Sequence, residues 1–320
     1  MSNGRICSDN KSKKQTVFFV LCSLFRTFAP EIEKDMRILG IRRELNFSPN
    51  LAGNDAAIFM GVADELKVMG HEVAYINENE MVNTDFEPYD RVVTMARDVH
   101  SLTILKEKNV EKQTQFFNSV EGILACSDKA MVATIMQQMD IPQPAFIPSE
   151  DRKLPISEEG VGDIPYPVWL KKCDGCAEQK WDTIFCQSMK ETCHANKIMK
   201  RTHYQRWMAQ AHQKGDLVKF YGVEGTDFFR WQYASHGHSK FGYEEINGPE
   251  MGYPFDSHRI KEYADRLAKQ LNVPIYGGDV IIDENGEPWF IDFNDFPSFS
   301  SCREQASKVI ARRVVQGLEF

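Results

Sequence analysis

Short apolar runs alternate with longer mixed stretches over the first regular part of the chain, which begins at Met36. Strand-like runs fall at 36–41, 71–76 and 91–95, and a helical pattern ending near Gly70 separates the first two. Strands alternating with helices predict a parallel sheet that binds ligands outside its carboxyl edge. We expect the polar residues at this edge, together with one serine near the C-terminus, to contact a substrate, although each is also an ordinary loop or cap residue: Arg42, Arg43, Ser48, Asn50, Arg97, Asp98 and Ser298.

The pattern changes after residue 118. A helix capped by Ser127 or Asp128 is predicted to run to Met139, and the run Ile141-Pro142-Gln143-Pro144 ends it. Residues 207–223 predict a strand, a polar turn and a second strand, and 258–271 predict a helix with a buried stripe. This part of the chain is therefore predicted to be mixed α and β.

The most informative stretch is a predicted β-hairpin over residues 276–298, with the turn at Asp283–Gly286. Asp279 lies on its first strand. Asp292 and Asn294 lie two residues apart on the second strand and therefore point to one face. Because Mg²⁺ prefers oxygen ligands, these three side chains predict a site for this cation.

Composition bounds the class of protein. With 320 residues, 42% hydrophobic and 26% charged, the chain can bury a large core in two or three domains. A net charge of −8 argues against a nucleic-acid partner, because no dense basic stripe is available to neutralise phosphates. Eight irregularly spaced cysteines favour a reducing compartment, and we expect a cytoplasmic protein.

The N-terminal segment has a different character. Basic residues at 11–14 precede the apolar run Val17–Phe25, as in a signal peptide, but this run is too short to span a bilayer as a helix. We interpret residues 1–35 as an extension outside the fold that begins at Met36, with an export signal as the alternative.

The pattern Asp279, then Asp292-x-Asn294 and a proline, resembles the C-terminal signature of the ATP-grasp superfamily. Asn118-Ser119, followed by the Asp128-Lys129 helix and Ile-Pro-x-Pro, is similar to the start of many ATP-grasp domains. The matched stretches extend over residues 118–300. The resemblance implies an α/β fold with an N-terminal parallel domain at 36–117. A two-lobed ATP-grasp domain with antiparallel sheets follows, its central lobe at 118–205 and its C-terminal lobe at 206–320.

The same resemblance implies a site for ATP with Mg²⁺ or Mn²⁺. The metal ligands would be Asp279, Asp292 and Asn294, and Lys171, with Lys172 as the alternative, would contact the phosphates. Lys171 and Lys219 would offset the charge of the transferring phosphoryl group. The remaining nucleotide-binding positions are Lys129 and a strand whose backbone would bond adenine, Met208, Ala209, Gln210 and Ala211.

The loop after Lys172 departs from the family, because it contains cysteines where glycines are usual. Cys173-x2-Cys176 also matches the first half of a zinc site, but the later spacing through Cys186 and Cys193-His194 fits no common zinc module. Structural zinc and redox regulation stay open as alternatives.

Three functions are compatible with these residues. The first is a carboxylate-amine ligase that forms an acylphosphate, the activity of most ATP-grasp enzymes. The second is a small-molecule kinase, because Asp292-x-Asn294 followed by Phe296-Pro297 is close to the inositol phosphate kinase pattern. The third is a non-catalytic nucleotide-binding module. The implied partner is a small-molecule substrate with a carboxylate or hydroxyl acceptor, with no membrane partner, and the resemblance also suggests a homodimer.

Overall fold

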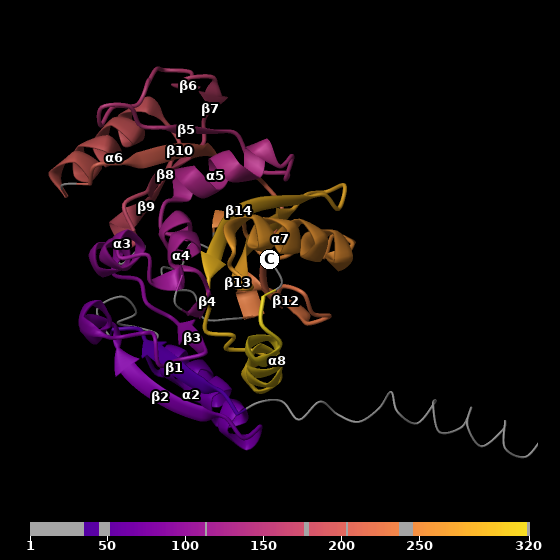
Figure 1. Ribbon diagram of the computed structural model, residues 1–320. Helices are drawn as coiled ribbons and strands as arrows, with labels where there is room; N and C mark the ends of the chain where they lie inside the picture. Colours follow the sequence, from indigo (N-terminus) through magenta and orange to yellow (C-terminus); the bar gives the residue numbers. More distant parts are fainter. Residues whose placement is uncertain are drawn as a thin grey trace, which may run out of the picture. The chain divides into compact units, whose positions relative to one another are not determined.

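A four-stranded parallel sheet with the order β2-β1-β3-β4 begins the fold (Figure 1). Alternate residues of β1 are buried on opposite faces, with Ile38 in the core beneath α2 and Leu39 in the core beside α3. The parallel sheet expected from the sequence is therefore present. Its elements are β1 (Arg37–Arg42), α2 (Ala52–Val68), β2 (Glu72–Asn77), η3 (Glu78–Asn83), β3 (Arg91–Thr94), α3 (Val99–Glu107), η4 (Val110–Lys112) and β4 (Gln115–Phe117).

This computed structural model describes residues 35–44, 52–112, 114–175, 179–202, 204–236 and 246–318. Apart from Asp35, the predicted extension 1–35 lies outside this range, and so do Ser48, Asn50 and Cys176. All elements from β1 onward belong to one unit of the chain. Within the described ranges, no helix is both long enough and apolar enough to cross a membrane.

A second sheet is antiparallel, with the order β5-β10-β8-β9. Val168 and Leu170 of β8 pack in one core with Ala195 of α6, which covers this face of the sheet. Two short helices precede the sheet. The elements of this part are α4 (Val120–Cys126), α5 (Lys129–Gln138), β5 (Phe146–Pro148), β6 (Gly160–Val161), β7 (Ile164–Pro165), β8 (Val168–Lys172), η5 (Lys180–Asp182), β9 (Thr183–Cys186), α6 (Met189–Arg201) and β10 (Trp207–Ala211).

The third sheet is also antiparallel, with the order β12-β11-β13-β14. β13 and β14 form the predicted hairpin, and Gly286 in its turn has the positive φ of 80° that the turn requires. α7 covers the core of this sheet with Ile260 and Leu267, and α8 packs against α2 (Figure 1). The elements are β11 (Asp216–Val223), β12 (Phe229–Tyr233), η6 (Ala234–His236), α7 (Ser257–Leu271), β13 (Ile275–Ile282), β14 (Pro288–Asp295) and α8 (Arg303–Gln316).

β10 and β11 do not pair with each other, although the sequence suggests two strands joined by a turn. β10 lies between β5 and β8 in the second sheet, whereas β11 lies between β12 and β13 in the third. Residues 212–215 therefore connect two sheets instead of closing a hairpin. The domain boundaries stay predictions, and the one drawn between 205 and 206 separates β10 from the strands with which it pairs.

Candidate active site

Lys171 links the second sheet to the hairpin of the third. Its buried ammonium group donates hydrogen bonds to Oε1 of Gln210 at 2.6 Å and to the carbonyl oxygen of Ile291 at 2.9 Å. Gln210 lies on β10, next to β8, and Ile291 directly precedes Asp292 on β14. A cation from one sheet is thus held beside the carboxylates of the other.

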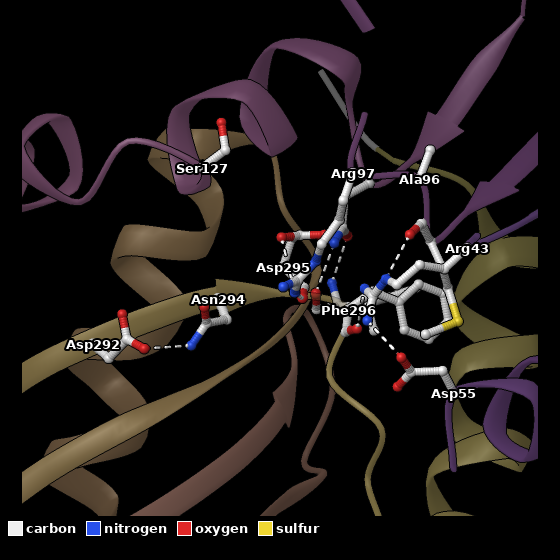
Figure 2. Close-up of polar contacts among 12 residues, drawn as sticks. Arg43, Asp55, Ala96, Arg97, Ser127, Asp292, Asn294, Asp295 and Phe296 are labelled. Carbon is white, nitrogen blue, oxygen red and sulfur yellow. Dashed lines mark hydrogen bonds and ion pairs between the residues drawn. The ribbon is translucent and has the colours of Figure 1, made fainter. Parts of the chain in front are cut away.

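The three predicted metal ligands lie together on the hairpin. Asp279 and Asp292 are directly opposite each other in the β13–β14 ladder. The side-chain amide of Asn294 donates a hydrogen bond to Oδ2 of Asp292 at 2.9 Å (Figure 2). The structure therefore brings together three side chains from two paired strands, as the sequence pattern implies.

Two further lysines pair with these carboxylates. Nζ of Lys129, the first residue of α5, lies 2.5 Å from Oδ1 of Asp292. Nζ of Lys219, opposite Asp279 on β11, lies 3.5 Å from Oδ1 of that aspartate. Asp128 caps the N-terminus of α5 by accepting hydrogen bonds from two backbone amides. This cap fixes the backbone position from which the Lys129 side chain extends.

Burial and neighbouring charges shift the pKa values in this cluster. Burial, with the nearby charge of Lys129, lowers the pKa of Lys171 to about 8. Burial acts to raise the pKa of Asp292, but Lys129 and Lys171 outweigh it and hold this pKa at about 2. For Asp279 burial prevails, and its pKa is raised despite Lys219. Several charged side chains thus lie together in one poorly solvated cluster. Perturbed pKa values of this kind are typical of functional sites.

The donor atoms of the hairpin fit a hard cation. Two carboxylates and an amide carbonyl provide oxygen ligands, and both carboxylates are already paired with positive charge. Within the described ranges, no group of three or more histidine, cysteine, aspartate or glutamate side chains could hold a metal ion. The candidate therefore depends on the amide of Asn294 as its third donor.

The predicted adenine-binding strand lies inside a sheet. Met208, Ala209 and Gln210 pair with β5 on one side and β8 on the other, so that strand pairing engages their main-chain groups. Ala211 ends β10, and its amide donates to the carbonyl oxygen of Ala145. The amide of His212 likewise donates to the carbonyl oxygen of Pro167, so the main chain is engaged by the neighbouring strands as far as His212, and the adenine contact at 208–211 stays a prediction.

A group of aromatic side chains lies at the start of the connection between β10 and β11, residues 212–215. Trp169 donates a hydrogen bond from its indole nitrogen to Nδ1 of His212 at 3.2 Å, and Phe185 packs against both rings. These side chains are half-buried. Trp169 is two residues before Lys171 on β8 and shares its face, so a flat apolar surface lies near the buried lysine.

The loop after β8 is held by its own polar contacts. The carboxylate of Asp174 accepts hydrogen bonds from the backbone amides of Gln205 and Arg206, and the amide of Gly175 donates to the carbonyl oxygen of Ser127. Gly175 has a positive φ of 89°. Residues 176–178 lie outside the described ranges.

Among the described cysteines of this region, Cys173 and Cys186 do not come together as the zinc hypothesis requires. Cys173 and Cys186 are free thiols in two different hydrophobic cores, and burial raises their pKa values to about 12 and about 11. Such thiols are mostly protonated near neutral pH, which disfavours zinc binding. The role of Cys176 stays untested.

The predicted substrate residues separate into two groups. Arg42 is exposed at the end of β1, and Ser298 is half-buried. Arg43 and Arg97 are instead engaged by the protein. Arg43 pairs with Asp55 at 2.9 Å, and Arg97 lies 3.3 Å from the carboxylate of Asp295. The structure thus gives these two arginines internal partners, and their substrate role stays a prediction. Asp98 caps α3 by accepting a hydrogen bond from the amide of Ser101.

Two residues of the site, Asp295 and Glu78, were not found by sequence reasoning, and a third, Gln210, was predicted only for its backbone. Gln210 bonds Lys171, Asp295 pairs with Arg97, and Glu78 accepts hydrogen bonds from the backbone amides of two loops. A charge directly after β2 was the available signal for Glu78, and a charge at the end of β14 was the signal for Asp295, because a buried charge requires partners.

Comparison with known proteins adds to this geometry. The model of the tubulin-tyrosine ligase family matches residues 258–318, which extend from α7 to α8. No curated protein matches the chain. The D-alanine-D-alanine ligase from Coxiella burnetii is 12% identical, with a TM-score of 0.61 over 88% of this chain and 94% of that chain.

Two further solved structures give the same result. The D-alanine-D-alanine ligase from Bacillus anthracis complexed with ATP is 12% identical, with a TM-score of 0.62 over 89% of this chain and 100% of the other. The RimK domain protein ATP-grasp from Sphaerobacter thermophilus DSM 20745 is 14% identical, with a TM-score of 0.61 over 87% and 99%. The chain has the ATP-grasp fold. The predicted fold class, a parallel α/β part followed by antiparallel sheets, is thereby confirmed.

Proposed function

We propose that this ATP-grasp protein is an ATP-dependent ligase that joins a carboxylate to an amine through an acylphosphate. The observation that carries the proposal is the placement of Lys171 and Lys129 against Asp292 on the hairpin. Lysines suit polyphosphate, and paired carboxylates suit the cation that accompanies it. One buried cluster can therefore bind both parts of a metal nucleotide.

In this proposal Asp279, Asp292 and Asn294 hold Mg²⁺, with Mn²⁺ as the substitute. When bound, the cation would neutralise negative charge on the nucleotide phosphates. Lys129 and Lys219 now pair with the same carboxylates. When a cation binds these carboxylates in place of the lysines, the ammonium groups of Lys129 and Lys219 would be close enough to contact the phosphate oxygens.

The other nucleotide contacts follow from the strands. Gln210 accepts a hydrogen bond from Lys171 and so orients this ammonium group. The half-buried rings of Trp169 and Phe185 provide an apolar surface suited to a purine base, beside the connection 212–215 between β10 and β11. These features support ATP as the cofactor.

The reaction would proceed in two steps. A carboxylate oxygen of the substrate attacks the γ-phosphorus of ATP, the bond to the β-phosphate oxygen breaks, and ADP leaves. The amine then attacks the acyl carbon, phosphate departs with the former carboxylate oxygen, and a proton passes to solvent. Lys171 and Lys219 would stabilise the negative charge of the transferring group.

The ligase is favoured over the kinase by the similar proteins. Two of the structures described above are D-alanine-D-alanine ligases, and the matching family model is that of tubulin-tyrosine ligases. Both names denote ligases that act on an amino acid. An amino acid or a peptide is therefore the substrate class that we would test first.

The test is a product assay on the full chain with Mg-ATP, pooled amino acids and short peptides, and hydroxylamine. Hydroxylamine traps acylphosphates as hydroxamates, so hydroxamate together with ADP and phosphate would support the ligase. ADP with a stable phosphate ester and no hydroxamate would make the protein a kinase. Binding of ATP without turnover on any acceptor would make it a non-catalytic nucleotide-binding module.

A further inference from the structure

The end of β14, which carries the proposed metal ligands, is held by two arginines from the parallel sheet. Arg97, just beyond β3, donates a hydrogen bond from Nη2 to the carbonyl oxygen of Asp295 at 3.0 Å and lies 3.3 Å from Oδ1 of the same residue. Arg43, just beyond β1, donates from Nη2 to the carbonyl oxygen of Phe296 at 3.3 Å (Figure 2). The residue next to Asn294 is thus bound by both its backbone and its side chain.

These contacts are shielded from solvent. The side chains of Arg97 and Asp295 are 14% and 5% exposed. Oδ2 of Asp295 is buried and accepts no hydrogen bond from the described residues. The guanidinium of Arg97 therefore compensates a buried negative charge, and its removal would leave that charge uncompensated.

The backbone at this point also needs support. Phe296 has a positive φ of 23°, a conformation that is rare for a residue with a bulky side chain, and its ring is fully buried. Its amide donates to the carbonyl oxygen of Ile275, and its carbonyl accepts from Arg43. Contacts on both sides thus hold β14 at the point where the chain turns away from the sheet.

Arg97 is itself fixed by a buried carboxylate. Glu78 follows β2 directly and accepts hydrogen bonds from the backbone amides of Arg97 and Asp98, and from that of Glu44 at 3.0 Å. These amides belong to the segments after β3 and β1. The Glu78 carboxylate thus links the carboxyl ends of β1, β2 and β3 and fixes the backbone position of Arg97.

We propose that Arg97 is a positioning residue that fixes the metal-binding end of β14 to the carboxyl edge of the parallel sheet. Asp292 and Asn294 point to one face of β14, and Asp295 points to the other. By binding Asp295, Arg97 fixes the position of β14 relative to the parallel sheet. It therefore also fixes the position of the oxygen donors on Asp292 and Asn294. The inference rests on the proposed nucleotide and metal site, and it makes the segments after β1, β2 and β3 part of the structure that maintains this site.

The test measures binding of a non-hydrolysable ATP analogue to the full chain as Mg²⁺ is titrated. Arg97→Gln is expected to raise the Mg²⁺ concentration for half-maximal binding about tenfold, as for other residues that support a metal ligand. Arg97→Lys should recover part of this loss, because it keeps the charge but not the forked geometry. The matched control is Arg37→Gln, which removes an exposed ion pair with Glu72 from the same sheet and should leave the Mg²⁺ titration unchanged.

A double-mutant cycle with Asp295→Asn separates positioning from general destabilisation. If Arg97 acts through Asp295, the double variant should need no more Mg²⁺ than Arg97→Gln alone. Additive effects, or an unchanged Mg²⁺ titration in folded Arg97→Gln, would overturn the inference. If Arg97→Gln does not fold, Arg97→Lys and Asp295→Asn decide the question by the same titration. Failure of the wild-type protein to bind the analogue would instead refute the proposed function.

Discussion

The ammonium group of Lys129 lies 2.5 Å from Oδ1 of Asp292, although the two residues are 163 positions apart in the chain. The contact joins the start of α5 to the hairpin of the third sheet. A lysine and an aspartate that neutralise each other without ligand can each take a new partner when metal and phosphate arrive together. This relationship underlies the account of the site and the first prediction.

Asp292→Asn should abolish Mg²⁺-dependent nucleotide binding and leave the fold intact. The substitution keeps the shape of the side chain and removes the charge on which Lys129 and the proposed cation depend. Calorimetric titration with Mg-ATP should show a loss of more than about 100-fold in affinity. The control is Glu287→Gln, in the turn of the same hairpin, which breaks an exposed ion pair with Arg259 of α7. Affinity equal to wild type in Asp292→Asn would refute the metal assignment.

Nucleotide affinity should fall as the pH rises through about 8. Burial, followed by Lys129, lowers the pKa of Lys171 to about 8, so this side chain is charged below that pH and neutral above it. A neutral lysine cannot offset phosphate charge, and affinity should drop up to about tenfold per pH unit beyond that point. Lys171→Arg, which stays charged, should bind with nearly constant affinity over the same range. The same pH dependence in both proteins would assign it to another group.

Lys171→Ala should weaken ATP binding far more than Lys172→Ala. The two side chains point to opposite faces of β8. Lys171 reaches Gln210 and the carbonyl oxygen of Ile291, whereas the ammonium of Lys172 lies 4.7 Å from the ring centre of Tyr204. Equilibrium binding of a fluorescent ATP analogue to both variants decides the order. The reverse order would move the assignment to Lys172, the alternative that the sequence left open.

The hairpin should depend on its core face for stability. Phe293 is buried between the proposed ligands Asp292 and Asn294, and its ring stacks on Tyr276 at 5.5 Å. Phe293→Ala should lower the free energy of unfolding by roughly 3–5 kcal/mol, because it removes a buried ring and leaves a cavity. Urea denaturation measures the change, and Phe293→Leu should lose much less. A loss below about 1 kcal/mol for the alanine variant would show that the site does not need this packing.

The sequence predicted what depends on local pattern. The hairpin followed from alternation and a turn with a glycine at positive φ, and the common face of Asp292 and Asn294 followed from their spacing. The sequence could not show how the sheets pair. A strand and a polar turn before β11 suggest a hairpin, but β10 buries Met208 and Trp207 on opposite faces and is paired on both sides. Only tertiary contacts decide between these arrangements.

The contacts of Arg43 and Arg97 also could not be predicted from local sequence. Arg43 and Arg97 lie just beyond the carboxyl ends of β1 and β3, where a parallel sheet is expected to bind ligands, and the sequence therefore suggested substrate contacts. Arg97 contacts Asp295, which is 198 residues away, and Arg43 contacts Phe296, which is 253 residues away. No local pattern in the sequence indicates such pairs. A buried arginine and a buried aspartate can be recognised as in need of partners, but the choice of partner requires the fold.

The most direct test of the account follows an oxygen atom. The full chain would be incubated with Mg-ATP and a pool of amino acids and peptides whose carboxyl groups carry a heavy-oxygen label, and the released phosphate would be analysed by mass spectrometry. Carboxylate activation predicts that one labelled oxygen passes from the acceptor to phosphate as the new amide forms. Turnover that releases only unlabelled phosphate, or that leaves the phosphoryl group on a stable ester, would contradict the proposed ligase.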